Sequence, residues 1–111
     1  MNDCIFCKIL SGDIPSTEVY SNAHVYAFRD INPKADSHIL VIPRTHIESA
    51  AEINADNSEL VARCFEAIAE IVRREGLSKR GFRVISNAGE GAGQTVPHLH
   101  FHVLSGSLGA F

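Results

Sequence analysis

Residues 98–104 read His-Leu-His-Phe-His-Val-Leu, so three histidines alternate with apolar residues near the end of this 111-residue chain. Strict alternation predicts a β-strand with one buried face. The apolar side chains then face a core, and the three imidazoles share the opposite face. An imidazole can attack, donate a proton or bind a metal near neutral pH. A fortuitous metal patch and a solvated strand face are the alternatives, but three histidines in register after a glycine-rich segment favour a functional site.

Several further blocks accompany this one. Segment 98–104 resembles the signature of the histidine triad (HIT) superfamily of nucleotide hydrolases and transferases. Residues 5–9, Ile-Phe-Cys-Lys-Ile, resemble the opening of its Hint branch. Residues 27–33, Ala-Phe-Arg-Asp-Ile-Asn-Pro, resemble the segment that cradles the nucleoside. Segments 38–43 and 93–96 follow in the family's order, so the resemblance covers nearly the whole chain.

The three catalytic candidates are histidines. A neutral imidazole attacks phosphorus and splits one displacement into two steps. His100 has a histidine on each side, and both its central place and the resemblance indicate the nucleophile, through a nucleotidyl-imidazole. Its other ring nitrogen then needs an acceptor, for which we expect a backbone carbonyl. His102 is expected to bind the phosphate and help the leaving group depart. His38 alone would be an ordinary histidine at a strand start; the resemblance implies a fourth histidine near the phosphate.

Substrate-binding candidates precede the triad. Asp30 alone would be a turn-forming aspartate, since Asn32-Pro33 follows it. The resemblance implies instead that it accepts hydrogen bonds from both ribose hydroxyls. Glycines in the loop 87–96 let backbone N–H groups approach a phosphate, unless the loop is only a flexible turn. The resemblance places four loop residues near the phosphate or the 5′ side of the ribose: Asn87, Gly93, Gln94 and Thr95. The resemblance also implies that five apolar residues form a wall around the base: Ile5, Phe6, Ile9, Phe28 and Ile31. Core packing is the competing role for each of them.

A metal site is suggested by Cys4-x-x-Cys7, which is half of a zinc site. A buried thiol pair or a redox pair are the alternatives. Zinc-bearing relatives couple such a motif to histidines at the positions of His46 and His98. The resemblance therefore implies zinc, and four protein ligands would make it structural. Cys64 falls on the apolar stripe of a helix and is expected in the core.

Composition narrows the class of protein. The net charge of −3 and a pI near 6.0 argue against a nucleic-acid-binding surface. The first residues show no basic start with an apolar run, and no apolar run is long enough to span a membrane. Three cysteines fit a reducing compartment better than a secreted disulfide framework. We therefore expect a single domain, residues 1–111, in the cytoplasm.

The elements that position these residues follow from patterning. A short helix is expected over 4–10, and a long amphipathic helix from the N-cap Asp56 to the C-terminal stop at Gly76. Apolar runs and alternation predict strands over 18–20, 25–28, 38–42, 82–87 and 98–104. This order indicates an α+β fold. The resemblance implies a five-stranded antiparallel sheet that extends to ten strands in a homodimer.

The expected function is hydrolysis of the P–N bond of purine nucleoside 5′-phosphoramidates, through the covalent His100 intermediate. Hydrolysis of dinucleoside polyphosphates, as in the Fhit branch, is an alternative. A nucleotide-binding regulatory or zinc-holding module with little turnover is another.

Overall fold

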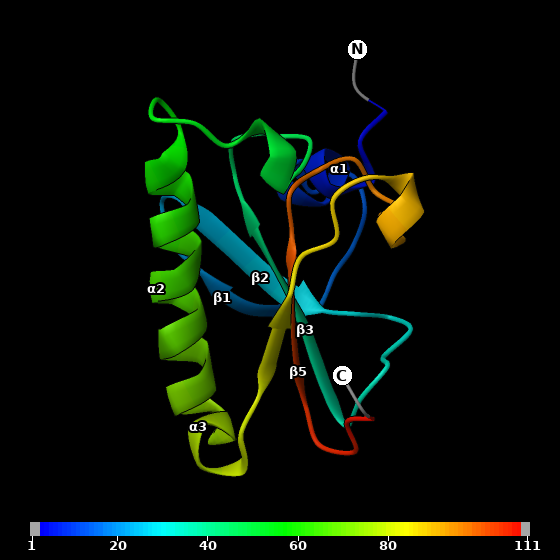
Figure 1. Ribbon diagram of the computed structural model, residues 1–111. Coiled ribbons are helices and arrows are strands. Elements are labelled where there is room, and N and C mark those ends of the chain that lie inside the picture. Colours follow the sequence, from blue (N-terminus) through cyan, green and yellow to red (C-terminus); the bar gives the residue numbers. More distant parts are fainter. Residues whose placement is uncertain (1–2, 110–111) are drawn as a thin grey trace.

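The computed structural model describes residues 3–109 and shows a five-stranded antiparallel sheet with helices packed against it (Figure 1). The strand order is β1-β2-β3-β5-β4. The α+β class and the five-stranded antiparallel sheet are thus confirmed. The elements are α1 Ile5–Ser11, β1 Glu18–Ser21, β2 Val25–Arg29, β3 Ser37–Pro43, η1 Ala50–Glu52, α2 Ser58–Arg74, α3 Leu77–Arg80, β4 Arg83–Ile85, η2 Glu90–Ala92 and β5 Phe101–Ser105.

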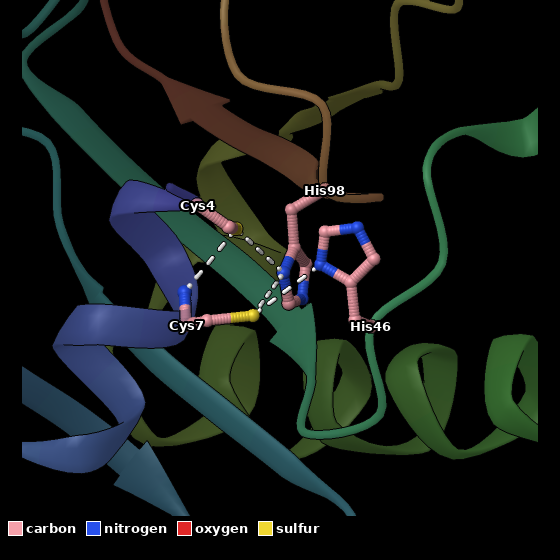
Figure 2. Close-up of side chains that lie close together, drawn as sticks. All are labelled: Cys4, Cys7, His46 and His98. Carbon is pink, nitrogen blue, oxygen red and sulfur yellow. Dashed lines mark hydrogen bonds between the residues drawn. The ribbon is translucent and has the colours of Figure 1, made fainter. Parts of the chain in front are cut away.

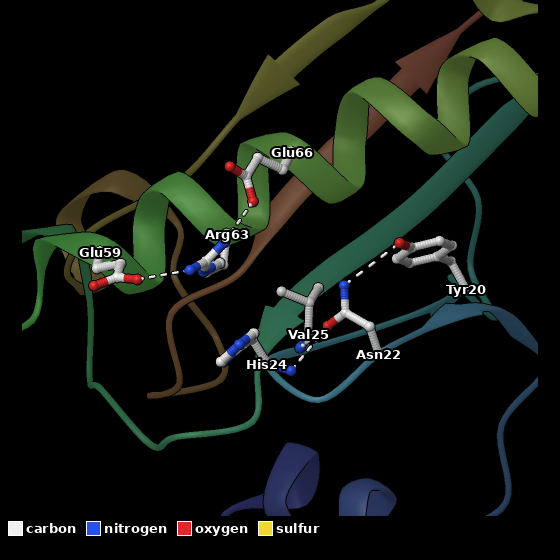
Figure 3. Close-up of polar contacts among 7 residues, drawn as sticks. All are labelled: Tyr20, Asn22, His24, Val25, Glu59, Arg63 and Glu66. Atoms are coloured by element: carbon white, nitrogen blue, oxygen red, sulfur yellow. Dashed lines mark hydrogen bonds and ion pairs between the residues drawn. The ribbon is translucent and has the colours of Figure 1, made fainter.

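The first hairpin is closed by a side chain. Oδ1 of Asn22 accepts hydrogen bonds from the backbone N–H groups of His24, at 2.8 Å, and Val25, at 2.9 Å (Figure 3). This is the local hydrogen bonding that makes asparagine a turn residue. It joins β1 to β2, at the positions where the sequence predicts two strands.

One face of the sheet packs against α2 (Figure 1). The apolar stripe of the helix meets alternate residues of the strands, and this core contains Cys64, Ala67, Ile68, Ile71, Val72, Val25, Ala27, Ile39, Val41, Leu99, Phe101 and Val103. Arg63 pairs with Glu59 at 2.8 Å and Glu66 at 3.1 Å along the helix surface (Figure 3). Such exposed pairs contribute little stability, so α2 is held mainly by its buried stripe.

The start of α2 differs from the expectation. The helix begins at Ser58, and Asn57 rather than Asp56 stands at its N-cap. The Asn57 side chain accepts the N–H of Asn54 and donates to the carbonyl of Glu52. Its amide therefore closes the preceding turn instead of capping the helix.

The opposite face of the sheet carries a second apolar cluster under α1. Phe6 of that helix packs with Phe28, Leu40 and Ile42. Because side chains alternate along a strand, His38 and the triad histidines lie on this same face. Among residues 3–109, no helix is both long and apolar enough to cross a membrane.

The triad segment is confirmed in its alternation but not in its full length as a strand. Leu99, Phe101 and Val103 are buried on the α2 side, whereas β5 begins only at Phe101. The N–H of Leu99 donates to the carbonyl of Ile47, beyond the end of β3. Residues 98–100 therefore lie outside the sheet ladder, and Leu99 bonds to the segment that carries His46.

Candidate active site

His100 is held in one tautomer by the main chain. Its Nδ1 lies 2.7 Å from the carbonyl oxygen of His98. A carbonyl only accepts, so Nδ1 carries the proton and Nε2 of the neutral ring is bare. Burial lowers the pKa of His100, with the His98 hydrogen bond opposing this shift, which favours the neutral ring. The expected carbonyl acceptor is present, and His100 offers a nucleophilic nitrogen.

A chain of hydrogen bonds fixes the tautomer of His102. The backbone N–H of Lys34 donates to Nδ1 of His38 at 3.0 Å, so the His38 proton sits on Nε2. That Nε2 lies 2.8 Å from Nδ1 of His102 and 3.4 Å from Oδ2 of Asp30. His102 therefore accepts at Nδ1 and keeps its proton on Nε2, as a donor.

The strand register explains why these two rings meet. In the β3–β5 ladder Leu40 pairs with His102 and His38 with Leu104, so the two histidines are diagonal neighbours on one face. Burial is the main cause that lowers the pKa of His38, and it lowers that of His102 to about 4, helped by the charges of the neighbouring histidines. Both rings are neutral near pH 7.

An apolar cavity opens beside the histidines, between α1 and the end of β2. All five residues predicted for the base wall line it, together with Asp30, Thr95, His100 and His102. Sequence reasoning missed Ile14, Pro15, Ser16 and Leu40 in this lining. Leu40 could have been found, because it stands two residues from His38 on the same strand face; the turn 14–16 carries no periodic signal.

A second cavity meets the first at the histidines. The two share Asp30, Thr95, His100 and His102. Beyond this junction the second cavity is lined by Asn32, Lys34, His38, Ile85, Asn87, Gly93 and Leu104. A molecule held across the junction would thus place its centre against the bare nitrogen of His100 and the N–H of His102.

A separate group of ligand atoms gathers where α1 meets the triad segment (Figure 2). Sγ of Cys4 lies 3.3 Å from Nδ1 of His98, and Sγ of Cys7 lies 3.3 Å from Nδ1 of His46. All four ligand atoms lie within 4.8 Å of one another. The predicted Cys4-Cys7-His46-His98 grouping is confirmed as a cluster that could hold a metal ion.

The donor chemistry of this cluster fits a metal. Nε2 of His98 lies 3.0 Å from the carbonyl oxygen of Pro43, so the proton is on Nε2 and Nδ1 faces the two sulfurs bare. A ligating histidine commonly donates its other N–H to a backbone carbonyl. Two thiolates and two imidazoles form the donor set of a closed structural zinc site.

Comparison with known proteins now decides the family. The family model described as HIT domain matches residues 11–108. The chain belongs to the HIT family. It is 39% identical to the purine nucleoside phosphoramidase of Escherichia coli strain K12 over 104 residues, 94% of this chain and 87% of the relative. A HIT family hydrolase from Clostridium thermocellum superposes with a TM-score of 0.95 at 40% identity, covering 100% of this chain and 97% of the other.

A histidine triad protein from Clostridium difficile superposes equally well, with a TM-score of 0.95 at 45% identity and the same coverage. The similarity to a named phosphoramidase and to a HIT family hydrolase identifies this chain as a HIT-family hydrolase. Among the catalytic candidates, His38 and His102 lie 2.8 Å apart, and His100 bonds to the main-chain carbonyl of His98 at 2.7 Å. The four metal candidates form the second cluster, with sulfur-to-nitrogen distances of 3.3 to 3.6 Å.

Gln94 occupies a different position from the other loop candidates. Its Nε2 donates to the carbonyls of Glu48 at 2.7 Å and Val96 at 2.9 Å, and its Oε1 accepts the N–H of Gly89 at 2.8 Å. Both amide protons are therefore used within the protein. In this HIT-family chain the Gln94 side chain ties the glycine loop to the segment after His46, and its contact with substrate stays a prediction.

Proposed function

We propose that this HIT-family hydrolase cleaves the P–N bond of purine nucleoside 5′-phosphoramidates and releases the nucleoside monophosphate and an amine. The observation that carries the proposal is the pairing of tautomers, a bare Nε2 on His100 beside a protonated Nε2 on His102. The name of the Escherichia coli relative, purine nucleoside phosphoramidase, supports this substrate class.

The chemistry takes two displacements. The lone pair on Nε2 of His100 attacks phosphorus, and the P–N bond to the amine breaks. Nε2 of His102 donates its proton to the departing nitrogen, which also keeps the bonding pair, and in the second step a proton of the attacking water returns to this Nε2. Water then attacks the nucleotidyl-imidazole, and the P–N bond to His100 breaks. Over both steps one water supplies the hydroxyl on phosphorus and the proton on the amine.

The nucleoside is proposed to lie in the apolar cavity, with the phosphate at the junction of the two cavities. There Asp30 accepts from the ribose hydroxyls, while the N–H of Gly93 and the side chains of Asn87 and Thr95 donate to the phosphate. Asp30 already accepts the N–H of Asn32 through Oδ1 at 2.8 Å. Each carboxylate oxygen has two acceptor sites, so capacity for the ribose is retained.

Replacing the nucleophile tests the function. His100→Asn removes Nε2 but leaves an amide that can donate to the His98 carbonyl. We expect turnover of adenosine 5′-phosphoramidate to fall by roughly three or more orders of magnitude, with adenosine monophosphate binding retained by calorimetry. Turnover close to wild type in this variant would disprove the covalent mechanism. Wild-type protein that hydrolyses only diadenosine tetraphosphate would favour the polyphosphate alternative.

We further propose that Cys4, Cys7, His46 and His98 hold one structural zinc. A metal there would fix His98, whose carbonyl oxygen lies 2.7 Å from Nδ1 of His100 and orients that ring. With four protein ligands, no coordination position of the metal would be open to substrate. The role of the zinc is therefore to join α1 to the triad segment.

We also propose a cytoplasmic homodimer in which β4 strands of two chains pair. The strand order leaves β4 at an edge of the sheet, and an unpaired edge accepts another strand. Two phenylalanines are also exposed: Phe82, directly before β4, at 39%, and Phe65 of α2 at 47%. Light scattering that gives the mass of one chain would contradict the dimer.

A further inference from the structure

If the nucleoside occupies the apolar cavity, as proposed, the second cavity does not bind the base or the ribose. Since the two cavities share Asp30, Thr95, His100 and His102, phosphorus sits between them. One substituent of phosphorus is the nucleoside. The other, the leaving group, must then extend into the second cavity, whose further walls include Lys34, Asn87 and Ile85.

Lys34 is the cation of this second cavity. Its Nζ donates to the carbonyl of Asn32 at 3.1 Å, which uses one of three ammonium protons. Within residues 3–109 no carboxylate forms an ion pair with it. Burial is the main cause of the lowered pKa of His38 and of His102, and the positive charge of Lys34 adds to the lowering of both.

The main chain and the side chain of Lys34 have separate tasks. Its N–H orients the ring of His38, and any residue except proline would supply that group. The ammonium is not needed for this bond. Its position in the wall therefore points to a contact with the bound molecule rather than to support of the histidines.

We propose that the second cavity is the leaving-group subsite and that Lys34 makes it select leaving groups that carry an anionic oxygen group, a carboxylate or a phosphate. This inference rests on the proposed function. The ammonium attracts the anion across the cavity, in addition to the contacts that every leaving group makes.

A matched pair of substrates tests the proposal. Adenosine 5′-phosphoramidates of glycine and of glycinamide have the same scissile bond and differ in one negative charge. We expect Lys34→Gln to lower the ratio of their kcat/KM values by about three- to ten-fold, in the range of a partly screened ion pair. Lys34→Arg should restore the ratio. Comparing ratios between proteins cancels the different basicities of the two amines and any change in His102.

Lys79→Gln is the control, because it removes the same charge from exposed α3, outside both cavities. The proposal is overturned while the function stands if Lys34→Gln leaves both the glycine-to-glycinamide ratio and the kcat/KM for diadenosine tetraphosphate unchanged, or if Lys79→Gln lowers the ratio equally. Wild-type protein that turns over neither of these substrates nor adenosine 5′-phosphoramidate overturns the function and this inference together, whereas activity on adenosine 5′-phosphoramidate alone overturns only the inference. A loss confined to diadenosine tetraphosphate supports the subsite with phosphate as the anion, and a loss confined to the glycine substrate supports it with carboxylate.

Discussion

His38 exchanges no proton or bond with the substrate in the proposed mechanism, yet it sets the tautomer of His102. His38→Phe keeps a flat ring in a site where His38 is only 4% exposed but removes the Nε2–H that lies 2.8 Å from Nδ1 of His102. The acceptor on His102 is then unpaired, at a cost of about 1–3 kcal/mol for a buried group. His102 can recover part of this cost by moving its proton to Nδ1, which removes the donor facing the leaving group.

If that cost falls on the transition state, kcat drops roughly five- to 150-fold. His38→Gln is the matched variant, because its amide can place an N–H near the former Nε2 and should keep kcat within a few-fold of wild type. Steady-state kinetics on adenosine 5′-phosphoramidate, with melting temperatures for each variant, provides the measurement. Equal losses in the Phe and Gln variants, or wild-type kcat in the Phe variant, would refute the tautomer argument.

Three further predictions concern the metal, the ribose and pH. Protein purified without added zinc should contain about one zinc per chain, and chelation should lower its melting temperature; metal-free protein, or no change on chelation, contradicts the site. A 2′-deoxy substrate should lose roughly one to two orders of magnitude in kcat/KM, and Asp30→Ala should narrow that preference; equal use of both sugars by wild type would leave Asp30 as a turn residue. Burial holds the pKa of His102 in the folded protein at about 4, against a usual value of 6.5. As the pH drops from 6.5 to 4, the unfolded chain therefore takes up this proton before the folded protein does, and the free energy of unfolding should fall. Denaturant titrations that give a constant free energy of unfolding across that window would disagree.

The local sequence determined which residue types share a face. Alternation over 98–104 placed Leu99, Phe101 and Val103 in the core and the imidazoles opposite, as the structure shows. The resemblance in ordered blocks added the family. These features depend on the period of a strand and on short motifs, and both are written in consecutive residues.

Apart from the backbone carbonyl expected for His100, the hydrogen-bond partners in the site could not be predicted from the sequence, because they depend on strand register and on the path of the backbone. His38 and His102 are 64 positions apart and meet only through the β3–β5 register. The side-chain amide of Gln94 could donate to a substrate, but one of its N–H groups donates instead to the Glu48 carbonyl that the fold brings close. The family resemblance named His98 as a ligand, and only the tertiary structure turns its bare Nδ1 toward Cys4, 94 residues away. Residue type and period are local properties, whereas the tautomer of each histidine is decided by whichever donor or acceptor the fold places against its ring.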